Sequence, residues 1–315
     1  MLTLRRIPDL FFEVDMKKNS ISSFIYSWKV APYVFVLPFI LSLLVFWVYP
    51  LASSIMMSFQ NILPGQVEWI GLKNYTKLLK DKTFYMAVQN SFIYMVVTCA
   101  LLIPFPMLFA TIMNSAFMRA KNVYKAIFYI PALTSVVVAG TIFGFMFSEL
   151  DGSAANQFLY FLGFGSIKWL KMRGTGWFAM VLLCCWRWTG VNMLYFLSGL
   201  QAIDDSLYES SDIDGASKWQ KFWLITFPLL KPTSIYVLTI SIYAGLAMFL
   251  ESYMMWGGNS SPKNIGLTIV GYLYRRGIEK NQLGYASAVG IVLLLIALVI
   301  NVIQLVLNGT FRKEK

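Results

Sequence analysis

The feature that most constrains this chain is a series of long stretches without a charged residue. Five stretches contain no Asp, Glu, Lys or Arg, and a sixth, 174–203, contains only Arg187; the five are 30–67, 83–118, 126–148, 232–250 and 281–311. Each can hold the ~20 mostly apolar residues with which a helix crosses the core of a bilayer. Charged residues make up 13% of the chain, whereas a soluble domain has about 25%. The sequence therefore predicts an integral membrane protein.

The expected fold class is all-α, a polytopic membrane protein with about six transmembrane helices. An open chain in lipid satisfies its backbone polar groups only by forming helices. The expected spans are 32–57, 87–113, 124–147, 176–200, 230–254 and 284–308. Several spans contain prolines, which membrane helices tolerate as kinks when neighbouring groups satisfy the freed backbone; these are Pro38, Pro50, Pro104, Pro106 and Pro131.

The expected domain organisation is a membrane domain, 31–310, between two short polar ends. Residues 1–30 form a basic N-terminal segment, in which either Met1 or Met16 could be the start. Its aromatic and apolar residues could form a helix on the membrane surface, or the segment could be a basic tail that fixes orientation; they are Phe24, Ile25, Tyr26 and Trp28. Residues 311–315 form the C-terminal tail. Lys and Arg are somewhat more numerous on the side of the termini, which predicts that both termini are cytoplasmic.

The composition excludes several classes of function. The chain has no histidine, the commonest general base, and Cys99, Cys184 and Cys185 lie in apolar runs without metal-site spacing. It has neither of the glycine-rich phosphate-binding motifs. We therefore expect no catalytic residue, no metal site and no cofactor on this chain, and any ATP must be hydrolysed by another subunit. The net charge of +11 is spread over loops and tails, which favours contact with membrane lipid over nucleic acid.

A polar, acid-rich segment at 205–223 separates two apolar stretches. We expect it to form one helix, with Ser206 as N-cap and Glu209 completing a capping box. Its small residues would let a partner approach the backbone, and its carboxylates could pair with basic groups of that partner. An amphipathic helix resting on lipid is the alternative, but such helices favour a basic polar face. The expected docking residues are Glu209, Ser210, Ser211, Asp212, Gly215, Ala216 and Trp219.

The same segment carries a motif. Glu209-Ser210-Ser211-x3-Gly215-x9-Ile225-x-Phe227-Pro228 resembles the Glu-Ala-Ala-x3-Gly-x9-Ile-x-Leu-Pro signature of permease subunits of binding-protein-dependent ABC importers. The chain is similar to the sugar branch of that family, which includes the maltose and glycerol-phosphate permeases, and above all to arabinose-oligosaccharide permeases of Gram-positive bacteria. Further landmarks are 124–131, 199–203 and 264–268. Ser210, Ser211 and Phe227 depart from the signature, which leaves their effect on docking open.

The resemblance implies a type I ABC importer permease fold in a bacterial plasma membrane. It implies that 205–223 contains the coupling helix, seated on a cytoplasmic ATPase dimer that hydrolyses ATP with Mg. It also implies a second homologous permease subunit and an extracellular solute-binding protein that delivers a sugar, expected to be an oligosaccharide. A self-contained secondary transporter is the alternative, but it would need ion-coupling carboxylates within the spans, where Glu251 stands alone near one end.

A sugar pathway is expected around Arg187, because a charge inside a membrane span is by default functional. Trp188 and Asn192 next to it offer an apolar face and hydrogen-bonding groups. The expected pathway residues are Arg187, Trp188, Asn192, Ser241, Tyr243 and Glu251. In the alternative interpretation Arg187 locks two permeases together, and Glu251 either pairs with Arg187 or caps its span. The resemblance places Arg187, Trp188, Ile240, Tyr243, Ala244 and Ala247 near the positions that line the sugar site of the maltose permease.

Overall fold

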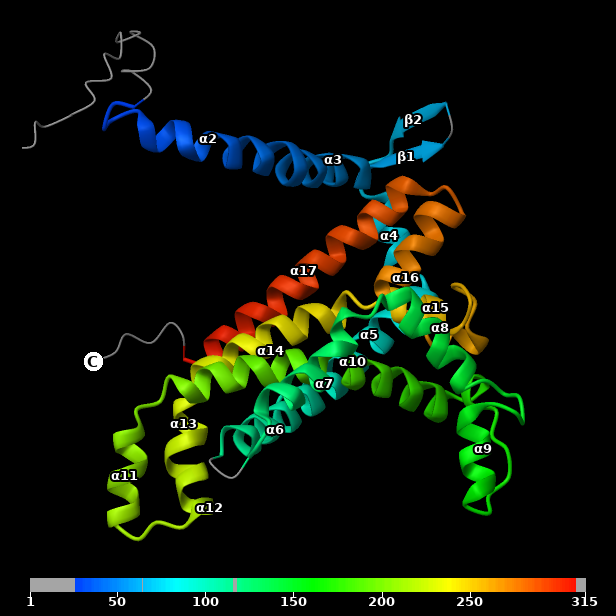
Figure 1. The fold of residues 1–315 in the computed structure, drawn as a ribbon. Coiled ribbons are helices and arrows are strands. Elements are labelled where there is room, and N and C mark those ends of the chain that lie inside the picture. The colour runs from blue at the N-terminus through cyan, green and yellow to red at the C-terminus, as the bar shows by residue number, and fades with distance from the viewer. Residues whose placement is uncertain (1–25, 64, 116–117, 310–315) are drawn as a thin grey trace, which may run out of the picture. The chain divides into compact units, whose positions relative to one another are not determined.

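The structure is a computed structural model that describes residues 26–63, 65–115 and 118–309 (Figure 1). It divides into two compact units, residues 1–53 and 54–315. The predicted surface residues Phe24 and Ile25, the alternative start Met16 and the tail 311–315 lie outside the described residues. Tyr26 and Trp28 are exposed in a turn before the first helix.

The first span runs without a break from Ala31 to Ser58. It consists of α2 (Ala31–Leu43), a π-helical turn (Leu44–Val48) and α3 (Tyr49–Ser58). Pro50 cannot donate a backbone hydrogen bond, and the wide turn lies directly before it, as is common where a helix accommodates a proline. The large apolar side chains of this span are exposed, which suits a helix surrounded by lipid.

The second unit is built around α10 (Arg173–Gln201). This helix packs against α5 (Lys82–Leu102), α6 (Pro104–Asn114) and α14 (Lys231–Leu246), and α14 also packs against α17 (Leu283–Leu307). Small residues allow the closest approaches. A Cβ added to Gly190 of α10 would lie 1.8 Å from the carbonyl oxygen of Phe128, so the two backbones are in direct contact there.

Two predicted spans are broken. The span expected at 124–147 consists of α7 (Lys121–Leu133) and α8 (Val136–Met146), bent by 91°. Pro131 removes one helical hydrogen bond, and Thr134 and Ser135 then adopt ψ of 132°. The span expected at 230–254 ends at Leu246, and the short α15 (Leu250–Met255) follows separately. Among the described residues, four helices are long and apolar enough to span a membrane, or six spans if each bent pair counts as one.

The connections between the long helices form short helices, turns and one β-hairpin. Beyond the N-terminal end of α10 lies α9 (Ala154–Phe161), followed by a 3-10 turn (Trp169–Lys171). The loop after α15 leads through a turn (Pro262–Asn264) to α16 (Ile269–Tyr274) and a π-turn (Arg275–Glu279). Before α5 stand α4 (Lys73–Leu78) and an antiparallel hairpin of β1 (Gln60–Leu63) and β2 (Gln66–Trp69).

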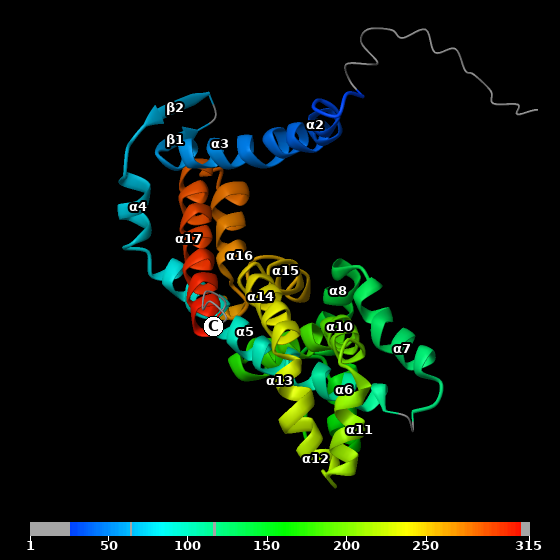
Figure 2. The ribbon, with the colours of Figure 1, turned by 90° about the vertical axis from the view of Figure 1, so that its left-hand side faces the viewer.

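At the opposite end, two short helices project from the bundle side by side (Figures 1 and 2). They are α11 (Asp205–Ile213), which follows α10, and α12 (Lys218–Lys221). A π-turn (Phe222–Thr226) and α13 (Phe227–Leu229) connect α12 to α14. We call residues 204–226 the α11–α12 hairpin.

Candidate functional site

The α11–α12 hairpin is not the single helix that the sequence predicted. Gly215 has φ of +74°, a left-handed conformation that glycine adopts without strain. The Gly215 N–H donates to the carbonyl of Asp212 at 3.1 Å, and the Ala216 N–H donates to that of Ser211 at 2.9 Å. These two bonds form a Schellman C-cap, which ends α11. Glycine after a polar helix was the sequence signal for this break.

The caps of the hairpin also differ from the prediction. Asp204, not Ser206, caps α11, and its carboxylate accepts from the Ser206 N–H at 2.9 Å. The backbone N–H and the hydroxyl of Ser206 lower the pKa of Asp204. A carboxylate at this position accepts the backbone hydrogen bond and also complements the helix dipole. The capping box lies instead at the start of α12, between Ser217 and Gln220.

Side-chain contacts hold the two helices of the hairpin together. Asp212 of α11 forms an ion pair with Lys221 at the end of α12. The hydroxyls of Tyr208 and Thr226 lie 2.9 Å apart, and Thr226 is buried. These contacts make the hairpin a defined structural unit.

The two serines that depart from the importer signature bond within their own helix. The Ser210 hydroxyl donates to the carbonyl of Leu207 at 3.2 Å, and the Ser211 hydroxyl donates to that of Tyr208 at 2.7 Å. A serine in this arrangement presents little more to a partner than an alanine. Ser210 and Ser211 therefore keep the small side-chain volume that the signature has at these two positions, and their hydroxyls are bonded within α11.

The tip of the hairpin is exposed and partly apolar. The side chains of Ile213 and Trp219 are 88% and 70% exposed, an unusual position for large apolar groups on a polar loop. No atom lies within 4 Å of a Cβ built on Gly215. Of the seven predicted docking residues, Glu209, Ser210, Asp212, Gly215 and Trp219 are exposed, and Ser211 and Ala216 are half-buried.

The predicted pathway residues meet only in part. A cavity of about 200 Å³ lies between α5, α10 and α14, and four of the six predicted residues line it: Trp188, Asn192, Ser241 and Glu251. Tyr243 is 65% exposed and lines a different cavity against α17. Tyr94 and Thr98 of α5, which the sequence analysis did not single out, complete the polar part of the lining.

Arg187 lies beside this cavity and is held by its own chain. Its guanidinium donates to the Glu251 carboxylate at 3.0 Å, and it lies 3.5 Å from the carbonyl oxygen of Thr134. Thr134 stands at the bend between α7 and α8. Arg187 is 8% exposed, so the ion pair is largely shielded from solvent. Of the alternatives left open by the sequence, the structure shows pairing with Glu251.

Asn192 has a structural partner that the sequence did not reveal. Its amide donates to the carbonyl of Leu102 at 3.0 Å. In a regular helix that carbonyl would accept from residue 106, which is proline and has no N–H. Asn192 therefore satisfies the acceptor freed by the kink between α5 and α6, as membrane helices require.

A polar cluster at the starts of α5 and α17 was also missed. The Asp81 carboxylate accepts from the Tyr272 hydroxyl and from Arg276, both at 2.6 Å. Tyr285 lies 3.0 Å from the Tyr272 hydroxyl. Tyr272 and Tyr285 are 13 residues apart, but Asp81 is 191 residues from Tyr272, so no local spacing pattern could have indicated the cluster.

Comparison with known proteins identifies the family of this chain. Residues 102–313 match the family described as the binding-protein-dependent transport system inner membrane component. The chain belongs to this family. The match begins at the kink between α5 and α6 and includes the whole α11–α12 hairpin. This permease is therefore a transport component of an ABC importer and not an enzyme.

Curated relatives match the permease over almost its full length. The arabinooligosaccharides transport system permease protein AraP of Bacillus subtilis (strain 168) is 51% identical over 298 residues, 95% of each chain. AraP of Halalkalibacterium halodurans is 48% identical over 302 residues, covering 96% of this chain and 95% of that one. The lactose transport system permease protein LacF of Rhizobium radiobacter is 31% identical over 92% of this chain and 97% of its own. None of them supports a self-contained secondary transporter.

Solved structures confirm the fold. The crystal structure of a bacterial ABC transporter involved in the import of the acidic polysaccharide alginate matches 90% of this permease and 96% of its own chain, with a TM-score of 0.80 and 24% identity. A second structure holds the alginate transporter in complex with an alginate pentasaccharide-bound periplasmic protein, again with a TM-score of 0.80 and with 23% identity. The type I importer permease fold predicted from the sequence is thereby confirmed.

Proposed function

We propose that this permease is one of two membrane subunits of a bacterial importer for oligosaccharides, with arabinose-containing oligosaccharides as the first candidates. The observation that carries the proposal is the 51% identity over 95% of the chain to a permease named for arabinooligosaccharide transport. The mixed lining of the cavity between α5, α10 and α14 supports it, because sugars bind where an aromatic face lies beside hydrogen-bonding groups.

The α11–α12 hairpin is proposed as the site that docks on a cytoplasmic ATPase dimer. Its exposed Ile213 and Trp219 offer an apolar contact, and Glu209 and Asp214 offer exposed carboxylates for basic groups of a partner. The sequence contains no phosphate-binding loop, so ATP and Mg would be bound by that partner. A second, homologous permease and an extracellular solute-binding protein would complete the importer.

The connection between hairpin and cavity supports a mechanism. The hairpin continues α10 on one side and leads into α14 on the other, and both helices line the cavity. A movement of the hairpin when the ATPase closes would therefore move two walls of the cavity. Such a movement would switch the cavity between the two sides of the membrane while the sugar makes weak contacts.

Both termini are proposed to be cytoplasmic, on the side of the hairpin. Single cysteines at Ser206 and at Gly165, in a chain whose three native cysteines are replaced, would report the two sides. A membrane-impermeant maleimide should label Gly165→Cys on intact cells and Ser206→Cys only after lysis. The opposite labelling pattern would reverse the orientation.

The substrate is tested by stimulation of ATP hydrolysis in the purified complex. The solute-binding protein is loaded in turn with arabinose oligosaccharides, with maltose oligosaccharides or with no sugar. We expect the arabinose oligosaccharides to raise ATPase activity well above the other two. Equal stimulation by all three preparations would contradict the proposed substrate class.

A further inference from the structure

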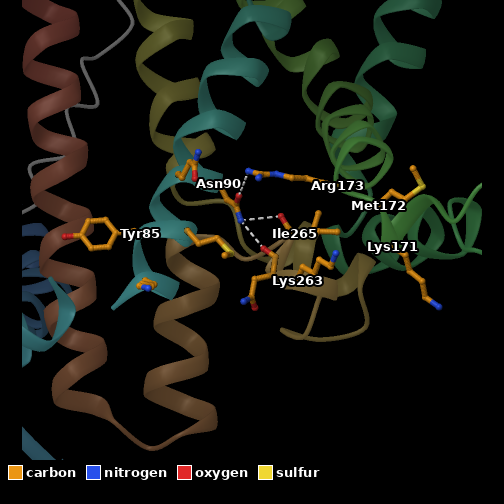
Figure 3. A pocket seen from close by; sticks show the side chains of 11 residues that line it. Tyr85, Asn90, Lys171, Met172, Arg173, Lys263 and Ile265 are labelled. Carbon is orange, nitrogen blue, oxygen red and sulfur yellow. Dashed lines mark hydrogen bonds between the residues drawn. The ribbon is translucent and has the colours of Figure 1, made fainter. Parts of the chain in front are cut away.

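A large cavity lies at the end of the bundle opposite the α11–α12 hairpin, and we call it the outer cavity. Its volume is about 650 Å³, within the range of about 300–1,000 Å³ that is usual for small-molecule sites. The start of α5, the start of α10 and the loop at 263–265 line it (Figure 3). It is separate from the cavity beside Arg187.

The lining of this outer cavity is basic. Lys82, Lys171, Arg173 and Lys263 line it, and none of the described residues in its wall is acidic. Lys171 pairs with Glu149 at 2.5 Å, and in Figure 3 its side chain extends away from the other residues. Across the described ranges, Lys82 and Lys263 take part in no ion pair, and Arg173 reaches the amide oxygen of Asn90 at 3.4 Å. The positive potentials of these three side chains add within a partly enclosed space.

One wall of the cavity is a strained and tightly held loop. Lys263 and Asn264 are consecutive residues with φ of +50° and +55°, a conformation that residues other than glycine rarely adopt. The Asn90 amide donates to the carbonyls of Asn264 and Leu267, both at 3.0 Å, and Arg275 donates to the Asn264 side chain at 2.9 Å. Strain held in place by its surroundings is characteristic of ligand-binding segments.

We propose that this cavity binds the carboxylate of an acidic sugar unit, so that the importer accepts oligosaccharides that carry a uronic acid. The inference rests on the proposed transport of oligosaccharides. Arg173 and Lys263 would bind the carboxylate, because charge-assisted hydrogen bonds are the strong ones. The amide of Gln89, which also lines the cavity, is available to the hydroxyls of the sugar. A recessed cavity of this volume fits a sugar unit of one or two rings better than the surface of a second protein.

Direct binding to the permease–ATPase complex in nanodiscs of neutral lipid tests the proposal. The probes are digalacturonic acid and galactobiose, which differ in their carboxylates. Calorimetry should show the acidic disaccharide binding about tenfold more tightly, and about 1 M salt should remove this advantage because it screens exposed charges. The double variant Lys263→Gln/Arg173→Gln should lose the advantage. The control variant Lys168→Gln/Lys280→Gln, which removes two charges outside the cavity wall, should keep it.

Equal affinity of the two disaccharides in the wild type would overturn the proposal, as would an advantage that survives in the double variant. If the double variant does not fold, the wild type alone decides: the tighter binding of the acidic disaccharide must disappear at high salt, and an advantage that persists there would overturn the proposal. A third outcome is also possible: the double variant no longer binds the solute-binding protein, and the wild type binds both disaccharides equally. That outcome would overturn the proposal and show that the cavity is part of a protein-docking surface. Stimulation of ATPase activity by arabinose oligosaccharides in the same wild-type preparation tests the proposed function separately.

Discussion

Asp81 shows how a single side chain can join distant segments. Its carboxylate caps α5 through the Thr83 N–H at 2.8 Å and also binds Tyr272 and Arg276. Burial by itself would raise the pKa of Asp81, but the hydrogen bonds from Tyr272 and Thr83 and the charge of Arg276 outweigh burial and lower it. The ionised form therefore stabilises the fold.

We expect Asp81→Asn to destabilise the packing of α5 against α16 and α17 by about 1–3 kcal/mol, the usual effect of losing a hydrogen bond to a charged group. A carboxyl with a lower pKa in the folded state stabilises above its unfolded pKa and loses that effect as the pH falls through its folded pKa. The difference in apparent thermal midpoint between wild type and variant should therefore be full at neutral pH and shrink on acidification. A difference that stays constant on acidification would contradict the role of the carboxylate.

The ion pair between Arg187 and Glu251 gives a second prediction at the residue scale. Arg187→Ala would leave Glu251 unpaired at 16% side-chain exposure, and breaking a buried pair in this way costs about 3–5 kcal/mol. The variant should transport poorly. The double variant Arg187→Met/Glu251→Gln, which removes both charges, should recover much of the thermal stability; a double variant less stable than Arg187→Ala would contradict the pairing.

The ATPase should still co-purify with Arg187→Ala. Arg187 lies about 20 Å along the axis of α10 from Gln201, at 1.5 Å per residue, whereas the proposed docking residues lie beyond that end. Loss of the ATPase on purification would mean that Arg187 supports assembly of the complex and not the cavity alone.

At the scale of elements, Gly215 is the position where docking and folding can be separated. Gly215 and Gly163, the latter just after α9, both have positive φ, +74° and +83°, and no atom lies within 4 Å of either Cβ position. A side chain at either site is therefore strained by about 1 kcal/mol without clashing inside the chain.

We expect Gly215→Leu and Gly215→Trp to abolish ATP-driven uptake, because the added side chain would project from the hairpin towards the ATPase. Gly163→Leu and Gly163→Trp, with the same strain at the other end of the molecule, should keep most of it. Uptake in vesicles, with protein levels in the membrane as control, measures both. Equal losses in the two series would show that strain alone, and not docking, explains the effect at Gly215.

The sequence predicted well those elements that depend only on the local run of residues, such as the membrane spans. Stretches without charge located the spans because charge is costly anywhere in lipid. The break at Thr134 and Ser135 was missed because Pro131, its local signal, is also compatible with an intact kinked helix. The break at Gly215 was missed because the spacing of polar and apolar residues suggested one continuous stripe, although glycine is the usual residue at a helix end.

The candidate sites were predictable to the extent that they are local in sequence. The hairpin is contiguous, so its motif identified it. Which side chains face the cavity depends on how each helix is rotated about its axis, and tertiary packing sets that rotation. Ser241 lines the cavity, whereas Tyr243, two residues later, does not. The role of Asn192 at Leu102 and the cluster at Asp81 join residues far apart in the chain, and no single-sequence pattern records such pairs.

At the scale of the whole molecule, the two ends of the helix bundle carry different structural features. The end opposite the α11–α12 hairpin carries the strained basic loop and the cluster at Asp81. The other end carries the exposed hairpin, and α10 and α14 connect it to the cavity between them. This arrangement places the cavity where movements of the hairpin would reach it, which fits the proposed coupling to a separate ATPase.

Transport of sugar across the membrane of lipid vesicles tests the central claim most directly. The complete importer is reconstituted with its ATPase on the outer face of the vesicles, so that ATP is added from outside. The solute-binding protein and radiolabelled arabinose oligosaccharide are enclosed. The account predicts release of the sugar to the outside that requires both ATP and the solute-binding protein and is indifferent to proton and sodium gradients. Release driven by an ion gradient without ATP would contradict it and identify a secondary transporter.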